Sequence, residues 1–215
     1  MDYLIGIDAS TTNTGVSVFR LLKSGARYYK HHLLSYKGKK VSQYRKSKMT
    51  KVQKKDIRHE EADNRVNFMI TSLLELLERY KPKVVVIEDI FAKTDINTMK
   101  LLGRIQGAVL AFCLTHDSYI EIKAPSAWRS DVGLGMGKRE DLKKRAIETV
   151  SRLYDIQVTD DEADSILIGL SYIKAREKTE PTSNSEQGEI KNVKRRRNNA
   201  AKSENDRKGR TRQKG

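Results

Sequence analysis

Four carboxylates stand where hydrophobic segments of the chain end or begin. Asp8 and Glu88 each close a short apolar run of the kind that forms a buried strand, and Asp161 and Asp164 open the segment DEADSILIGL. A carboxylate at the end of a buried strand loses solvation, so it needs a compensating partner. A cation shared by several acids would be such a partner. The sequence therefore suggests a metal site.

The spacing of these acids allows them to meet. In an open α/β sheet the ligand crevice lies at the carboxyl ends of the strands, where Asp8 and Glu88 are expected. If their strands are neighbours, about 4.8 Å apart, the two carboxylates can reach one cation. Asp161 and Asp164 are three residues apart and hence lie on one face of a helix.

The start of that helix admits a second interpretation. Thr159 and Glu162 fit a capping box, which puts Asp161 in the first turn, near the positive end of the helix dipole. Taken alone, Asp161, Glu162 and Asp164 are better explained as acids that complement this dipole. Two further acids at strand ends, together with strongly basic segments elsewhere in the chain, favour the metal site.

The ligand types indicate which metal to expect. No His or Cys accompanies the acids, so a hard, oxygen-binding ion is expected, Mg²⁺ or Mn²⁺ rather than Zn²⁺. Four carboxylates suit two ions about 3.5–4 Å apart, an arrangement that activates water and stabilises the leaving oxygen of a phosphodiester. We expect two Mg²⁺ ions per site, with Mn²⁺ able to replace them.

The elements that must position the acids form a β-meander followed by alternating helices and strands. Apolar runs predict strands over residues 3–8, from 16, over 26–35, 83–88 and 119–122. Three- and four-residue apolar spacing predicts helices over 66–80, 95–115, 139–154 and 161–176. This order predicts an α/β fold, a mixed five-stranded sheet flanked by helices.

The positive charge is confined to two segments. The chain has a net charge of +15, and residues 37–58 hold ten Lys or Arg against one acid. Residues 176–215 hold thirteen Lys or Arg against six acids, so the remainder is close to neutral. We expect one domain over 1–176 with a basic insertion at about 37–58, followed by a disordered basic tail over 177–215. Such patches indicate a polyanionic partner.

Nucleic acid fits that partner better than a membrane does. No apolar run approaches the ~18–20 residues that span a bilayer, and no signal peptide is evident. The basic segments also lack the apolar spacing of an interfacial helix. The single cysteine, Cys113, lies in an apolar run and is expected to be buried, as suits a reducing cytosol. We therefore expect a cytoplasmic protein of a bacterial or phage-infected cell.

Three motifs carry a family resemblance. LIGIDASTTNTGVSVF, VVVIEDIFAK and DEADSILIGL, in that order, resemble the RuvC-type Holliday-junction resolvases of the RNase H-like superfamily, over roughly residues 3–175. The resemblance implies that Asp8, Glu88, Asp161 and Asp164 are metal-binding catalytic acids. It also implies a homodimer whose two sites each cut one of two symmetric strands of a four-way DNA junction, leaving 5′-phosphate and 3′-hydroxyl ends.

The same resemblance suggests DNA contacts. By its apolar setting alone Phe91 would be a core residue, but it matches the aromatic residue that bacterial members wedge into the junction. The expected DNA-binding residues are Phe91, Lys93, Lys138, Arg139, Lys48, Lys51, Lys54 and Lys55. Ala9-Ser10 replaces the usual Pro-Gly, and the basic insertion and tail are extra. These departures look more like the phage-encoded branch, and they leave junction selectivity open.

Parts of the sequence also resemble those of proteins with other functions. GIDASTTNTG also resembles the first phosphate motif of sugar-kinase and actin-like ATPases, but the chain lacks their two lobes and second phosphate loop. The glycine-rich run before Arg139 fails as a P-loop, so no nucleotide cofactor is expected. A non-catalytic protein on a degenerate nuclease fold has no need of four acids. A broader branched-DNA or flap endonuclease is the main alternative.

Trp128 is interpreted as a packing residue in a turn.

Overall fold

A computed structural model describes residues 1–38, 47–90 and 95–179 of the protein. Met1–Ala175 form one compact unit, and a second unit begins at Arg176. Of that second unit, only the residues that end the last helix belong to the described part of the chain, so most of the predicted basic tail lies outside it. Among the described residues, no helix is long and apolar enough to cross a membrane.

In the described part of the chain, five strands form one mixed sheet, as the sequence predicted, and their order is β3-β2-β1-β4-β5. Strand β1 pairs antiparallel with β2 and parallel with β4, which also pairs parallel with β5. The strands are β1 (Asp2–Asp8), β2 (Asn13–Leu22), β3 (Gly25–Ser35), β4 (Val84–Glu88) and β5 (Tyr119–Lys123). The helices are α2 (Lys51–Tyr80), α3 (Ile96–Thr115), α4 (Pro125–Val132), α5 (Arg139–Tyr154) and α6 (Asp160–Thr179).

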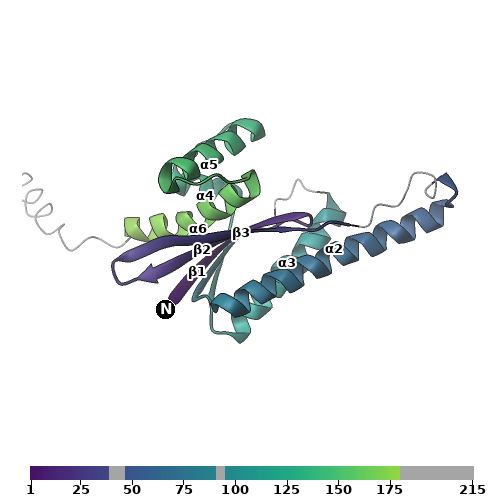
Figure 1. The fold of residues 1–215 in the computed structure, drawn as a ribbon, viewed down its shortest axis with the longest axis horizontal. Coiled ribbons are helices and arrows are strands. Elements are labelled where there is room, and N and C mark those ends of the chain that lie inside the picture. Colours follow the sequence, from purple (N-terminus) through teal and green to yellow (C-terminus); the bar gives the residue numbers. More distant parts are fainter. Residues whose placement is uncertain (39–46, 91–94, 180–215) are drawn as a thin grey trace, which may run out of the picture. The chain divides into compact units, whose positions relative to one another are not determined.

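Helices cover both faces of the sheet. Figure 1 shows α2 and α3 on one side of the strands and α4, α5 and α6 on the other. The alternation of side chains along a strand explains the two cores. In β1, Ile5 and Ile7 pack against α2 and α3, whereas Leu4 packs with Trp128 and α6. Both faces of β1 are thus buried, as its continuous apolar run predicted.

Helix α2 begins well before residue 66, where the apolar pattern predicted its start. Its buried residues start only at Val66, so the first turns pack against no core and show no apolar spacing. Their start is fixed locally instead, because Thr50 and Gln53 form a complete capping box. The residues from 51 of the predicted basic insertion are therefore an exposed helix. The helix ends as expected at Lys81, in a left-handed conformation just before Pro82.

A short helix stands where the sequence indicated a turn. Helix α4 has Pro125 at its first position, where the missing N–H costs nothing, and it ends at Gly133 with φ 77°. Its eight residues are too few for an apolar period to stand out. The prediction that Trp128 is a packing residue is nevertheless confirmed, since its side chain is 1 % exposed.

Glycines allow α6 to approach β1 and β2 closely. A Cβ on Gly15 would lie 1.9 Å from the Asp161 carbonyl oxygen, and one on Gly6 would lie 2.5 Å from the Ser165 oxygen. On the helix side, a Cβ on Gly169 would meet the Phe19 ring at 2.5 Å. These contacts fix the distance between the sheet and the helix that carries Asp161.

The tight contact at Gly15 predicts the effect of one methyl group. Gly15→Ala should push the first turn of α6 away from β2 and lower the free energy of unfolding by about 1–3 kcal/mol. Denaturant unfolding measures this change. Ser24→Ala, in the exposed turn between β2 and β3, is the control and should leave the stability close to that of the wild type. Equal stability of the Gly15 variant and the wild type would contradict the close approach.

Candidate active site

Asp8 and Glu88 lie side by side at the carboxyl ends of two adjacent parallel strands. Leu4 pairs with Val84 in the register of β1 and β4, and both face the α6 side of the sheet. Asp8 and Glu88 come four residues later, so their side chains face the same side. The two carboxyl groups are close enough to share a hydrogen bond. The strands of Asp8 and Glu88 are thus neighbours, which is the condition under which the two carboxylates can reach one cation.

The N-terminal end of α6 brings Asp161 and Asp164 to the same place. The predicted capping box is present: the Glu162 backbone N–H donates to Thr159 Oγ1 at 3.3 Å, and the Thr159 N–H donates to Glu162 Oε2 at 2.8 Å. Asp161 is the second residue of the helix, as expected. The charges of Asp161 and Asp164 both act on Asp8. The structure therefore gathers all four predicted acids.

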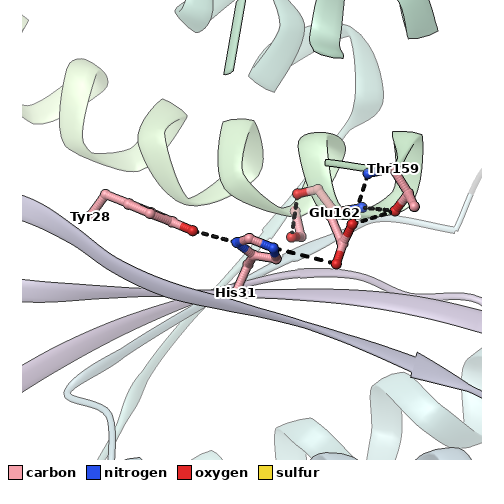
Figure 2. A network of polar contacts seen from close by, with 5 residues as sticks. Tyr28, His31, Thr159 and Glu162 are labelled. Atoms are coloured by element: carbon pink, nitrogen blue, oxygen red, sulfur yellow. Dashed lines mark hydrogen bonds and ion pairs between the residues drawn. The ribbon is translucent and has the colours of Figure 1, made fainter. Parts of the chain in front are cut away.

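A side chain from β3 also holds this turn, as Figure 2 shows. His31 Nε2 lies 3.4 Å from Glu162 Oε1, the carboxylate oxygen that takes no part in the capping box. The Tyr28 hydroxyl is hydrogen-bonded to His31 Nδ1 on the other side of the ring. Glu162 thus links the acid-bearing turn to the sheet. The sequence indicated its capping role but gave no sign of its partner in β3.

Burial and mutual repulsion set the protonation of the acids. Burial, and then the charges of Glu88, Asp164 and Asp161, raise the pKa of Asp8 well above its usual value. Burial followed by Glu88 raises the pKa of Asp164 to about 7. Burial also raises the pKa of Asp161, with Asp160 as the next cause. The cluster therefore lacks enough nearby positive charge to compensate it.

Among the described residues, cations do stand at the edge of the cluster. Arg129 Nη2 is 3.7 Å from Glu88 Oε1, and its charge opposes the rise in the pKa of Asp164. Lys143 forms an ion pair with Asp160, next to the acid-bearing turn. Arg139 is close enough to lower the pKa of Asp161. Of the described residues predicted to bind DNA, Arg139 is therefore one that the structure places beside the acids.

Sequence reasoning missed one polar contact of the site. The Trp128 indole N–H donates to Glu88 Oε1 at 2.8 Å, and the Arg129 guanidinium lies over the Trp128 ring, 4.7 Å from its centroid. Helix α4 thus reaches Glu88 across 40 residues of sequence. A buried indole usually finds a hydrogen-bond acceptor, which is the only general signal that could have suggested such a contact.

The family of the chain follows from a match over more than half of its sequence. The family model described as crossover junction endodeoxyribonuclease RuvC matches residues 37–172, more than half of the chain. The chain belongs to the RuvC family. The resemblance inferred from the three motifs is thereby confirmed, and with it the assignment to a family of endonucleases.

Curated RuvC proteins show the same relationship at moderate identity. The crossover junction endodeoxyribonuclease RuvC of Dictyoglomus turgidum is 32% identical over 114 residues, which cover 53% of this chain and 72% of that protein. The RuvC of Caldicellulosiruptor saccharolyticus is 23% identical over 171 residues, covering 79% of this chain and 91% of that protein.

Solved structures of resolvases share the fold. Thermus thermophilus RuvC, in complex with a Holliday junction substrate, aligns with a TM-score of 0.56 at 19% identity, covering 81% of this chain and 95% of that one. The fowlpox virus resolvase, in complex with substrate Holliday junction DNA, aligns with a TM-score of 0.51 at 17% identity, covering 81% and 98%. The predicted mixed sheet flanked by helices is therefore the RuvC fold.

The chemistry of the acid cluster fits the metal dependence of the RuvC family. The donors are carboxylate oxygens, and a buried group of like charges gains most from a hard divalent cation. In the described part of the chain, however, no three His, Cys, Asp or Glu side chains stand close enough together to hold an ion. The acids are gathered at one end of the sheet, but they do not surround a single point in the described part of the chain.

The other predicted DNA contacts that the structure describes are exposed lysines at the start of α5 and near the start of α2. Phe91 and Lys93 lie outside the described residues. Lys138 caps α5, and its side chain is exposed. The remaining lysines are exposed at the start of α2 or just before it, and they are Lys48, Lys51, Lys54 and Lys55.

The raised pKa of Asp164 predicts a pH-dependent stability. The folded protein holds this proton more tightly than the unfolded chain, so stability is lost as the pH rises from about 4 to about 7. Without metal, Asp164→Asn should be more stable than the wild type at pH 8, by at most ~4 kcal/mol, and the difference should vanish below about pH 4. Denaturant unfolding in EDTA across this range measures it.

A charge-matched control accompanies that measurement. Asp56 is exposed on α2, away from the acids, so Asp56→Asn should leave the pH dependence of stability as in the wild type. A stability difference for Asp164→Asn that stayed constant from pH 4 to pH 8 would contradict the raised pKa.

Proposed function

We propose that this RuvC-family protein is a divalent-metal-dependent endonuclease that resolves four-way DNA junctions by paired strand cleavage. The carrying observation is the contact of the half-buried Asp8 with Glu88, at a place where the charges of Asp161 and Asp164 also act on Asp8. The relatives from T. thermophilus and fowlpox virus, which were solved with Holliday junction DNA, support the choice of substrate.

Each acid has a distinct part in the proposed site. Two Mg²⁺ ions, or Mn²⁺ in their place, would supply an activated water and stabilise the leaving 3′ oxygen of the phosphodiester. Asp8 and Glu88, fixed by paired strands, form the rigid side of the site. Asp161 and Asp164, at the N-terminal end of α6, form the opposite side. Because Asp8 and Asp164 hold protons tightly, binding a cation should release protons to solvent.

Removing one ligand charge tests the proposed metal site directly. Asp8→Asn and Glu88→Gln should bind a four-way junction as the wild type does but lose Mg²⁺-dependent cleavage to background, because each removes a carboxylate and keeps the shape. Gel-based cleavage and fluorescence anisotropy measure the two properties. Glu121→Gln, in β5 and paired with Lys123, is the control and should cleave normally. Cutting at wild-type rate by either variant would end the assignment.

The substrate needs its own measurement. A panel of four-way junction, fork, flap and duplex at matched salt should show paired cuts in the junction at a much higher rate than any cut in the others. Cutting of forks and flaps at the same rate as the junction would favour the broader branched-DNA endonuclease. The exposed basic start of α2 could support the non-selective DNA binding of such an enzyme.

We further propose that the exposed lysines at the start of α2 contact phosphates, together with the basic segment 177–215. Neutralising Lys51, Lys54 and Lys55 to Ala should weaken binding to junction and duplex alike and reduce the slope of log K against log [salt] by about 2–3. Anisotropy titrations at several salt concentrations measure this slope. Lys23→Ala, in the β2–β3 turn, is the control for loss of one exposed charge. An unchanged slope in the triple variant would place the DNA elsewhere.

A homodimer is proposed through the exposed face of α3. Small and apolar residues recur along this face where a surface helix normally carries polar ones. They are Ile96, Gly103, Gly107, Leu110, Ala111 and Leu114, all exposed in the single chain. A Cβ on Gly103 or Gly107 would meet nothing within 4 Å, so a second helix can approach closely there.

Leu114 is 74 % exposed and therefore tests this face. Leu114→Glu should raise the dimer dissociation constant by about 30-fold or more, because it buries a charge in an apolar contact, and leave the monomer folded. Sedimentation equilibrium and circular dichroism measure the two effects. Thr115→Glu, one residue along, is the control. A Leu114→Glu dimer as tight as the wild type would place the interface on another surface.

A further inference from the structure

The contact between Trp128 and Glu88 joins a core residue to the proposed metal site. Trp128 is 1 % exposed, and its ring packs in the core between α4 and α6, with Leu4 and Ile166 among its neighbours. Its only polar atom, Nε1, donates to Glu88 Oε1 at 2.8 Å. A ring that is packed on all sides cannot reorient, so the direction of this N–H is fixed by the hydrophobic core.

Both donors from α4 reach the same oxygen of Glu88. Arg129 Nη2 is 3.7 Å from Oε1, the atom that already accepts the indole N–H. Oε2 accepts from neither of these α4 donors, so it is the carboxylate oxygen that α4 leaves open to an ion. Glu88 is also held from the opposite face of the sheet, where the Gln106 side-chain amide lies 3.5 Å from its backbone carbonyl oxygen. The residue is thus restrained at both its backbone and its side chain.

Packing alone does not account for this pairing. A buried indole N–H needs an acceptor, but a neutral backbone carbonyl would satisfy it at lower cost than a carboxylate. A hydrogen bond to a carboxylate is stronger and sets its rotation. Groups that hold a metal-binding carboxylate in this way commonly tune metal affinity.

We propose that Trp128 is a positioning residue, whose indole N–H holds Glu88 Oε1 and presents Oε2 to the divalent cation. This role rests on the proposed metal site and adds to it a residue from α4. If Trp128 has this role, binding of the cation must change the environment of the indole N–H. Loss of this single donor must also weaken cation binding without weakening DNA binding.

The wild-type protein offers a direct reading of the first requirement. Trp128 is the only tryptophan of the chain, so one indole N–H signal is expected in a ¹⁵N–¹H correlation spectrum. Titration with MgCl₂ should shift this signal along a curve that matches the Mg²⁺ dissociation constant from calorimetry. A signal that stays in place while calorimetry records Mg²⁺ binding overturns the proposal, and this measurement needs no variant.

Trp128→Phe tests the second requirement, because it keeps an aromatic ring in the core and deletes the donor. We expect the dissociation constant for Mg²⁺ to rise about 10-fold or more. The Mg²⁺ concentration for half-maximal cleavage should rise in parallel, while junction affinity in EDTA stays as in the wild type. Val132→Ala is the control, because it also loosens the packing of α4 in this core but removes no donor to Glu88, and it should keep the Mg²⁺ affinity.

Glu88→Gln separates failure of this proposal from failure of the metal site. Normal Mg²⁺ affinity in Trp128→Phe, with cleavage lost in Glu88→Gln, overturns the positioning role and leaves the metal site standing. Wild-type cleavage by Glu88→Gln overturns the metal site and the positioning role together. Weak Mg²⁺ binding in Trp128→Phe and normal binding in Val132→Ala support the role of the indole N–H.

Discussion

The repulsion among four carboxylates is the constraint around which this fold is arranged. Asp8 is half-buried, and burial together with the charges of its neighbours raises its pKa. Acids in such a place tend to separate or to take up protons. Here they are kept together by elements that cannot move independently: two hydrogen-bonded parallel strands and a helix packed on glycines. The energy of the hydrophobic core thus maintains a charge arrangement that is unfavourable without a cation.

Contacts from β2, β3 and α4 hold the elements that carry the acids. On the sheet side, Ser17 Oγ donates to the Ser165 carbonyl oxygen at 2.7 Å, within the close contact of β2 and α6. At the helix start, His31 and the capping box hold Glu162, so the first turn cannot fray away from the strands. From α4, Trp128 and Arg129 approach Glu88.

Much of this site could be predicted from the sequence because its signals are local. Asp8 and Glu88 end unbroken apolar runs. Thr159 and Glu162, three residues apart, have the spacing of a capping box and so mark the start of a helix. What could not be predicted depends on partners distant in sequence. Trp128 looks like any core residue until Glu88 is placed beside it. The early start of α2 was missed because a solvent-exposed helix has no apolar period, and Phe91 lies outside the described residues.

The order in which the acids occur along the chain has a consequence for the living cell. Asp8 lies in the first strand, Glu88 near the middle, and Asp161 and Asp164 in the last helix described. During synthesis the sheet can begin to form while α6 is still inside the ribosome. A nascent chain, or one truncated before α6, therefore lacks half of the acids. A site that needs all four acids would therefore be complete only once α6 has emerged and docked on the sheet.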